Sequence, residues 1–175
     1  MLIVEGNYSS VINHKDRYYA ANRDSRTIQV FEQPSNQWKQ CYSFSIEAES
    51  NSYITLGIST ELLYVCSATD ARIEAYTLCG VHQFNADRRR DDTSDELNYP
   101  LICGTDSSGA ALIADYGNDL LQVLSVGGQW SIVQVQPSVS WPKGAVLVNG
   151  TLYVGECQNL FTKEYSINSY IPGHA

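Results

Sequence analysis

Hydrophobic and polar residues alternate in short runs along this chain of 175 residues. The runs are separated by turns rich in glycine, aspartate, asparagine and serine, as in the segment "ALIADYGNDLLQVL" at 111–124. No stretch keeps apolar residues at i, i+3, i+4 and i+7 over more than about two helical turns. The pattern therefore predicts antiparallel β-hairpins and argues against a helical solenoid.

The pattern also repeats four times. The stretches "YAANRDSRTIQVF" (19–31), "YVCSATDARIEAY" (64–76), "LIADYGNDLLQVL" (112–124) and "YVGECQNLFTKEY" (153–165) align without a gap. Each has a large apolar residue, a small residue two places later, a polar stretch and an alternating run, which degrades in the fourth copy. The copies start 45, 48 and 41 residues apart, which is the length of a four-stranded propeller blade.

These observations predict one all-β domain over residues 1–175, a β-propeller of about four blades with units at approximately 7–50, 51–97, 98–139 and 140–175. In the third unit we expect strands at 101–105, 111–115, 120–125 and 129–135. The blades could form a small ring or part of a six-bladed one, and a β-sandwich with similar strands is the alternative. Because an open propeller leaves sheet edges unpaired, we expect residues 2–5 to complete the last blade.

Composition agrees with an all-β fold and limits the partners. Twelve tyrosines and one methionine suit pleated, half-buried surfaces. Eleven basic against 19 acidic residues give a formal charge of −8, which disfavours nucleic acid. No apolar run approaches a membrane span of about 18 residues, and the amino terminus does not resemble a signal peptide. Five cysteines without a CxxC pair predict reduced, mostly buried thiols, so we expect a cytoplasmic chain without membrane contact.

The segment Glu96 to Trp130 resembles an NHL repeat, with the proline of "NYP", the turn "ADYGN" and the strand "LQVL". The other units look like weaker copies, because "ANRDSR", "SATDAR" and "ECQNLF" replace the Asp-x-x-Asn turn. The third unit is most similar to the NHL propellers at the carboxyl end of animal tripartite-motif (TRIM-type) proteins. The resemblance implies a surface that recruits protein partners or binds RNA. Such relatives usually have six blades and upstream RING, B-box and coiled-coil segments, and this chain lacks a Cys/His array of that kind.

The polar turns between the second and third strands are the candidate binding residues, because a propeller gathers equivalent turns on one face. The residues concerned are Asn22, Arg23, Arg26, Ser67, Asp70, Arg72, Tyr116, Asn118, Glu156 and Gln158. They could form a platform for a partner. Alternatively, Asp and Asn side chains bond their own backbone and Gly117 supplies a positive φ, so that the turns are only structural.

Two further features could bind a partner. Arg88, Arg89 and Arg90 lie in the polar insertion at 85–100 and could clamp a carboxylate or phosphate, although four nearby acids also make a self-neutralising loop plausible. Aromatic residues stand near the start of each unit: Tyr8, Tyr53, Tyr99 and Trp141. They could anchor a peptide or stack on bases, but we expect packing between blades for most of them, and retain Trp141 as a candidate.

The sequence shows little that suggests catalysis. His14, His82 and His174 are isolated, and no GxSxG, phosphate-binding glycine loop or EF-hand pattern is present. We therefore predict a chain that is not an enzyme and needs no cofactor or metal. The predicted function is binding of a protein or peptide partner, including recruitment of substrates to a ubiquitin ligase. The alternatives are an RNA-binding NHL domain and a propeller-fold hydrolase or lyase with site residues scattered over several blades.

Overall fold

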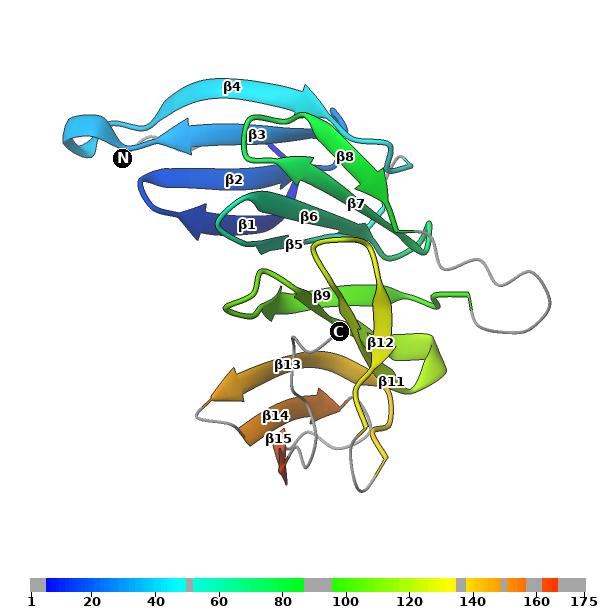
Figure 1. Cartoon of the computed structure of the whole chain (residues 1–175). Helices are drawn as coiled ribbons and strands as arrows, with labels where there is room; N and C mark the ends of the chain where they lie inside the picture. The colour runs from blue at the N-terminus through cyan, green and yellow to red at the C-terminus, as the bar shows by residue number, and fades with distance from the viewer. Residues whose placement is uncertain are drawn as a thin grey trace.

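The computed structural model describes residues 6–49, 52–86, 96–134, 138–148 and 151–156, and the backbone of 162–166. The chain forms four antiparallel sheets in sequence order, as Figure 1 shows. The first sheet contains β1 (Tyr8–His14), β2 (Arg17–Asn22), β3 (Thr27–Glu32) and β4 (Lys39–Ser45), and the second β5 (Ile54–Ile58), β6 (Leu62–Ser67), β7 (Arg72–Thr77) and β8 (His82–Asn85). The third contains β9 (Pro100–Thr105), β10 (Ala111–Asp115), β11 (Leu120–Leu124) and β12 (Trp130–Ile132), and the fourth β13 (Pro142–Val148), β14 (Thr151–Glu156) and β15 (Thr162–Ser166). Two short 3-10 turns, η1 (Pro34–Asn36) and η2 (Tyr116–Asn118), lie in the connections between strands.

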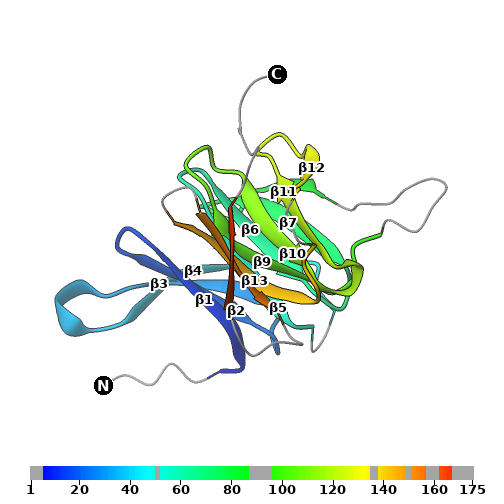
Figure 2. The same cartoon turned by 90° about the horizontal axis from the view of Figure 1, so that it is seen from below.

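The sheets are arranged as the blades of a β-propeller, which confirms the predicted fold class. Within each sheet the strands follow one another in sequence order. The first strands of the sheets are neighbours in the order β1, β5, β9 and β13, and Figures 1 and 2 show the sheets stacked from the first to the fourth. The strands predicted for the third unit agree with β9 to β12 to within a few residues at their ends.

The core lies between adjacent sheets, because each inner sheet is covered on both faces. For this reason the central strands are almost continuously buried: β6 and β7 have only end residues that are partly exposed. Three hydrophobic clusters fill the spaces between the first and second, second and third, and third and fourth sheets. The alternation in the sequence thus sets the strands, and contact between sheets buries both of their faces.

Two buried tyrosines connect neighbouring sheets. Tyr19 on β2 donates its phenol hydrogen to the Leu78 carbonyl at 3.3 Å, and Tyr64 on β6 donates to the Gly109 carbonyl at 2.9 Å. Burial raises the pKa of each phenol to about 12. Leu112 on β10 stands at the same position of the repeat, so the third sheet lacks this hydroxyl.

The backbone of the turns repeats more closely than their sequence does. Arg26, Ala71 and Asp119 occupy the same place in three turns and have φ of 52°, 50° and 56°. The expectation that Gly117 supplies the positive φ is wrong, because the left-handed residue is Asp119. Gly117 is instead confined by a close approach, since a Cβ there would lie 2.2 Å from Asn98 Cγ.

Three further predictions concern the amino-terminal strand, contact with a membrane and the burial of the cysteines. Residues 2–5, expected to complete the last blade, lie outside the described residues. No helix in the described ranges is long and apolar enough to cross a membrane. Four described cysteines are free thiols, and Cys41 and Cys79 are exposed, so the expectation of mostly buried thiols is wrong for these two.

Candidate functional site

One face of the molecule collects the features predicted to bind a partner. In each sheet the chain enters the first strand at the same end at which the second strand turns into the third. The residues directly before the first strands and the turns between second and third strands therefore share this face, which we call the turn face. The opposite face carries the remaining turns, between the first and second and between the third and fourth strands.

In the third unit, the polar turn residues bind the chain's own backbone. The buried Asp115 carboxylate accepts hydrogen bonds from the Asn98 N–H at 2.8 Å, from Gln122 Nε2 at 2.7 Å and from Asn118 Nδ2 at 2.9 Å. Asn118 Nδ2 also donates to the Glu96 carbonyl at 2.7 Å. This network fixes the segment that leads into β9.

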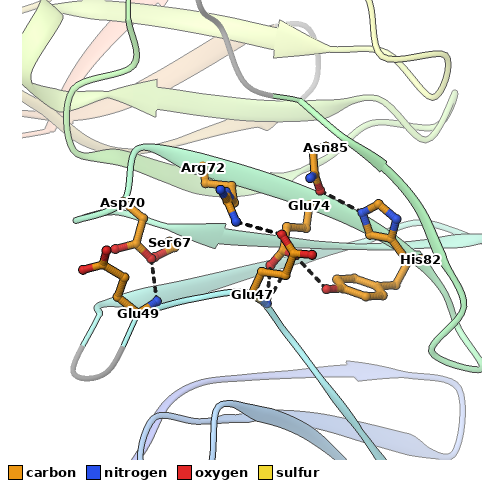
Figure 3. Close-up of polar contacts among 9 residues, drawn as sticks. Glu47, Glu49, Ser67, Asp70, Arg72, Glu74, His82 and Asn85 are labelled. Atoms are coloured by element: carbon orange, nitrogen blue, oxygen red, sulfur yellow. Dashed lines mark hydrogen bonds and ion pairs between the residues drawn. The ribbon is translucent and has the colours of Figure 1, made fainter.

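The second unit has the same arrangement with different residues (Figure 3). Ser67 donates a hydrogen bond to the Asp70 carboxylate, which also accepts the Glu49 N–H at 2.8 Å. Glu74 is buried beneath them and accepts the Glu47 N–H at 3.3 Å. Burial raises the pKa of the Glu74 carboxyl above its usual range. Here too the acids position the segment that leads into the next strand.

The first and fourth units repeat this structural role. Asn22 is buried, and its Oδ1 accepts the N–H groups of Asp24 at 3.1 Å and Ser25 at 3.0 Å, which is an Asx-type turn. Glu156 is buried and accepts the Ser140 N–H at 3.0 Å. Asn22, Ser67, Asp70, Asn118 and Glu156 thus make hydrogen bonds that shape the turns.

The other predicted residues are more accessible or lie outside the described residues. Arg26 is exposed, Arg23 and Tyr116 are partly exposed, and Arg72 is partly exposed and pairs with Glu47 at 2.9 Å. Arg88, Arg89, Arg90 and Gln158 lie outside the described residues.

Three exposed aromatic side chains form a row on the turn face. Tyr53, Tyr99 and Trp141 are 51 %, 55 % and 42 % exposed, and each directly precedes the first strand of its sheet. The Ile102 N–H donates to Thr55 Oγ1 at 2.9 Å and Thr105 Oγ1 donates to the Ile58 carbonyl at 2.6 Å. These two bonds keep β5 and β9 parallel and level, so Tyr53 and Tyr99 stand at neighbouring strand ends.

The last member of the row is held rigidly by the turn of the preceding unit. The Trp141 N–H donates to Asp119 Oδ1 at 2.6 Å, and the Trp141 ring lies 6.0 Å from that of Tyr116, measured between centroids. Lys143 Nζ lies 5.5 Å from the centroid of the Tyr116 ring. Tyr99 and Trp141 also have positive φ, 51° and 47°, which is strained for bulky residues. The backbone thus holds these side chains outward at a conformational cost.

Tyr53 and Tyr99 were expected to pack between blades, and the exposure of their side chains contradicts this. Tyr8 differs, because it is partly buried and its hydroxyl donates to Gln29 Oε1 at 2.5 Å. The sequence contains a signal for this exposure, because Tyr53 and Tyr99 occupy the same place in the repeat as Trp141.

Catalytic groups are sparse in the described part of the chain. Within it, no three His, Cys, Asp or Glu residues are grouped so that they could hold a metal ion. The His82 ring nitrogen Nε2 lies 2.7 Å from Asn85 Oδ1, at the edge of the second sheet (Figure 3). Burial raises the pKa of the Cys103 thiol to about 11, so it stays protonated and is a weak nucleophile near neutral pH.

Comparison with known proteins identifies the fold. No protein-family model matches the sequence, and no curated protein matches it significantly. A catalytically inactive variant of virginiamycin B lyase from Staphylococcus aureus with quinupristin matches at 11 % identity with a TM-score of 0.66, covering 93 % of this chain and 56 % of that one. An auxiliary nutrient binding protein from Bacteroides thetaiotaomicron matches at 10 % identity and 0.68, covering 91 % and 48 %. A putative 6-phosphogluconolactonase from Bacteroides uniformis matches at 11 % and 0.68, covering 91 % and 50 %.

These matches correct one prediction. The chain was expected not to be an enzyme, but the similar structures include a lyase and a lactonase as well as a binding protein. Propeller enzymes can take their site residues from different blades, which leaves no local motif, so the lack of such motifs in a sequence does not exclude an enzyme. The chain spans about half the length of the solved structures that it matches. At these identities the likeness shows the fold alone: the chain is a β-propeller, like its structural neighbours.

Proposed function

We propose that the chain binds a protein or peptide partner on its turn face. The observation that carries the proposal is the row formed by Tyr53, Tyr99 and Trp141, exposed at the leading ends of three consecutive first strands. Aromatic side chains dominate binding energy at protein interfaces, because they bury a large area at a small cost in conformational entropy. A rigid scaffold that presents them on one side suits such a role.

The charges of the turn face favour a partner segment with basic residues. Among the described residues, six acidic side chains reach the surface of this face: Asp24, Glu47, Glu49, Asp70, Glu96 and Asp119. Four described basic side chains accompany them: Arg23, Arg26, Arg72 and Lys143. Arg72 is already paired with Glu47, and aromatic rings beside carboxylates attract Lys and Arg side chains. The same excess of acid opposes binding of RNA.

Only the sequence supports a relation to the NHL domains of TRIM-type proteins. The NHL-like segment Glu96 to Trp130 supports a role like that of the NHL domains of TRIM-type proteins, which in this proposal includes recruiting substrates for a ubiquitin ligase. The four described cysteines are free thiols, which fits a reducing compartment such as the cytoplasm.

Selection of peptides from a random displayed library tests the proposal. The wild-type chain should enrich peptides rich in Lys, Arg and aromatic residues. The variant Tyr53→Ser/Tyr99→Ser/Trp141→Ser should bind them at least about 100-fold more weakly, because truncated anchors cost about 2 kcal/mol or more each.

The matched control is Val81→Ser/Val126→Ser, which removes two exposed apolar side chains from the opposite face. This control should bind the selected peptides as the wild type does. If the selected peptides bound the triple aromatic variant with unchanged affinity, the proposal would be wrong. Binding of RNA oligonucleotides that falls steeply with added salt would favour the RNA-binding alternative instead.

A further inference from the structure

A cavity of about 490 Å³ lies between the third and fourth sheets, near the opposite face of the molecule. Side chains from both sheets form its wall: Leu112 and Val123 on the third, and Ala145, Val146 and Leu152 on the fourth. The wall is mostly apolar, and its volume falls in the range of small-molecule sites, about 300–1,000 Å³. Cavities of about 150 Å³ lined by aliphatic side chains already bind benzene.

A residue of the repeat that differs from the other units lies in the wall of the cavity. Tyr19 and Tyr64 fill the corresponding spaces between the first and second and between the second and third sheets, and both are fully buried. Leu112 occupies the equivalent position on β10, as its pairing with Val123 and Gly104 shows, and it lines the cavity. A leucine is shorter than a tyrosine and has no hydroxyl, so the phenol found at the other two junctions is missing here.

The glycine that pairs with this residue on the first strand shows the same difference between the two junctions. Gly57 pairs with Tyr64, and a Cβ at Gly57 would lie 2.5 Å from Ile102 Cγ2 of the next sheet. Gly104 pairs with Leu112, and a Cβ at Gly104 would meet no atom within 4 Å. The third sheet therefore faces empty space where the second sheet touches its neighbour.

One polar group in the wall can bind a hydrogen-bond donor. Asp106 Oδ1 accepts hydrogen bonds from the Ser108 N–H at 2.8 Å, from Ser108 Oγ at 2.6 Å and from the Ala110 N–H at 3.0 Å. Asp106 Oδ2 is buried and accepts no hydrogen bond within the described residues. A buried carboxylate oxygen without a donor is costly, so a ligand hydroxyl that meets this oxygen after a small rotation of the Asp106 side chain would be stabilised.

The cavity can be reached from the side of β13. Val146, Leu147 and Val148 are 54 %, 45 % and 46 % exposed, and the first two line the cavity. A ligand can therefore enter without unfolding either sheet.

We propose that this cavity binds a small phenol, a molecule with one apolar aromatic ring and one hydroxyl. The ring takes the volume that the tyrosine side chain fills at the other two junctions, and the hydroxyl donates to Asp106 Oδ2 after a small rotation of that side chain brings this buried oxygen to the cavity. The site is separate from the turn face, so it does not depend on the proposed function.

The test uses p-cresol, which is the tyrosine side chain as a free molecule, and toluene, which lacks the hydroxyl. With the full chain, titration of p-cresol followed by amide NMR and calorimetry should give a dissociation constant of about 1 mM or lower. Chemical shifts should change on β10 and β13. The absence of binding, or shift changes confined to the turn face, would overturn the proposal.

Filling the cavity provides the decisive comparison. Leu112→Tyr should raise the melting temperature and weaken p-cresol binding at least about 20-fold, whereas the volume-conserving control Leu112→Met should keep the affinity within about threefold. Leu112→Phe provides a second filled variant, which needs no hydrogen-bond acceptor, if Leu112→Tyr does not fold. Binding of p-cresol to a folded, filled variant with unchanged affinity would contradict the assignment.

The hydroxyl contact has its own readout. Asp106→Asn should weaken p-cresol about tenfold and toluene less than about twofold, because only p-cresol donates to the carboxylate. Equal effects on both ligands would refute the role of Asp106. Tyr53→Ser/Tyr99→Ser/Trp141→Ser should bind p-cresol like the wild type, which keeps this test independent of the turn face.

Discussion

The two junctions on either side of the third sheet use the same repeat positions and differ in packing. Between the second and third sheets, Tyr64 is fully buried, a Cβ at Gly57 would lie 2.5 Å from Ile102 Cγ2, and Cys66 Sγ approaches the Pro100 carbonyl at 3.1 Å. Between the third and fourth sheets, Leu112 and Gly104 stand at the same positions beside a cavity of about 490 Å³. Gly57 and Gly104 each pair with the junction residue of the second strand, but the pairing of β9 with β10 shifts register between Leu112 and Ile113, whereas the pairing of β5 with β6 runs without a shift.

The difference shows that the backbone repeat alone does not determine how blades pack. The strand register places a side chain at the junction, and the size of that side chain decides whether the space is filled. A hollow junction can then become a binding site, while a filled one contributes stability.

Replacing Tyr64 by leucine should make the filled junction resemble the hollow one, and should have the largest effect. We expect Tyr64→Leu to lower the free energy of unfolding by about 3 kcal/mol, because it opens a buried cavity and leaves the Gly109 carbonyl without its donor. Urea denaturation followed by fluorescence measures this. Leu112→Met is the control, with an expected change below about 1 kcal/mol. Equal losses in the two variants would show that the junctions are energetically alike.

The two glycines should respond differently to the same added methyl group. Gly57→Ala should destabilise the chain by about 2 kcal/mol, since its Cβ collides with Ile102. Gly104→Ala should cost less, about 1 kcal/mol, because no described atom lies within 4 Å of its Cβ and only the φ of 159°, which L side chains rarely adopt, opposes the change. Thermal and urea unfolding of both variants would test this order, and a larger loss for Gly104→Ala would contradict the comparison.

One buried polar position, on the third strand of each sheet, should make the stability of the second sheet depend on pH and that of the third sheet not. Glu74 and Gln122 occupy it, and burial raises the pKa of Glu74. The contribution of Glu74 to stability is therefore full below its unfolded pKa and is lost as the pH rises through the raised folded value. Relative to the wild type, Glu74→Gln should therefore gain unfolding free energy as the pH rises above the unfolded pKa of a glutamate, about 4.3.

The control for this pH profile is Glu61→Gln, because Glu61 is exposed. Urea denaturation at several pH values should give parallel profiles for this control and the wild type. A Glu74→Gln profile parallel to that of the wild type would show that burial does not penalise the charged form.

The smallest change in the free energy of unfolding is expected on the turn face, where both junctions of the third sheet begin with an exposed aromatic residue. Tyr53→Ser, Tyr99→Ser and Trp141→Ser should each change the free energy of unfolding by no more than about 0.5 kcal/mol, because the side chains are exposed. Differential scanning calorimetry of the single variants checks this. A loss above about 2 kcal/mol in any of them would mean that the aromatic row supports the fold.

Much of the fold was predictable because strand periodicity and repeat length are local properties. The strands of the third unit and the propeller class followed from alternation and from the spacing of the four copies. The left-handed residue at Asp119 was not predictable, since Arg26 and Ala71 show that the position accepts unrelated side chains. Among the candidate binding residues, Trp141 is exposed, while Asn22 and Glu156 are buried under their own turns.

The sequence by itself determined the strands, their order and the face on which equivalent turns gather, because these depend on residue spacing. Only the tertiary structure decided which of those residues are exposed, since exposure depends on the neighbouring sheet. It also revealed that Leu112 lines a cavity between the third and fourth sheets, whereas Tyr64 is fully buried between the second and third. The volume left between two sheets depends on the side chains of both sheets, so the residue pattern of one strand cannot predict it.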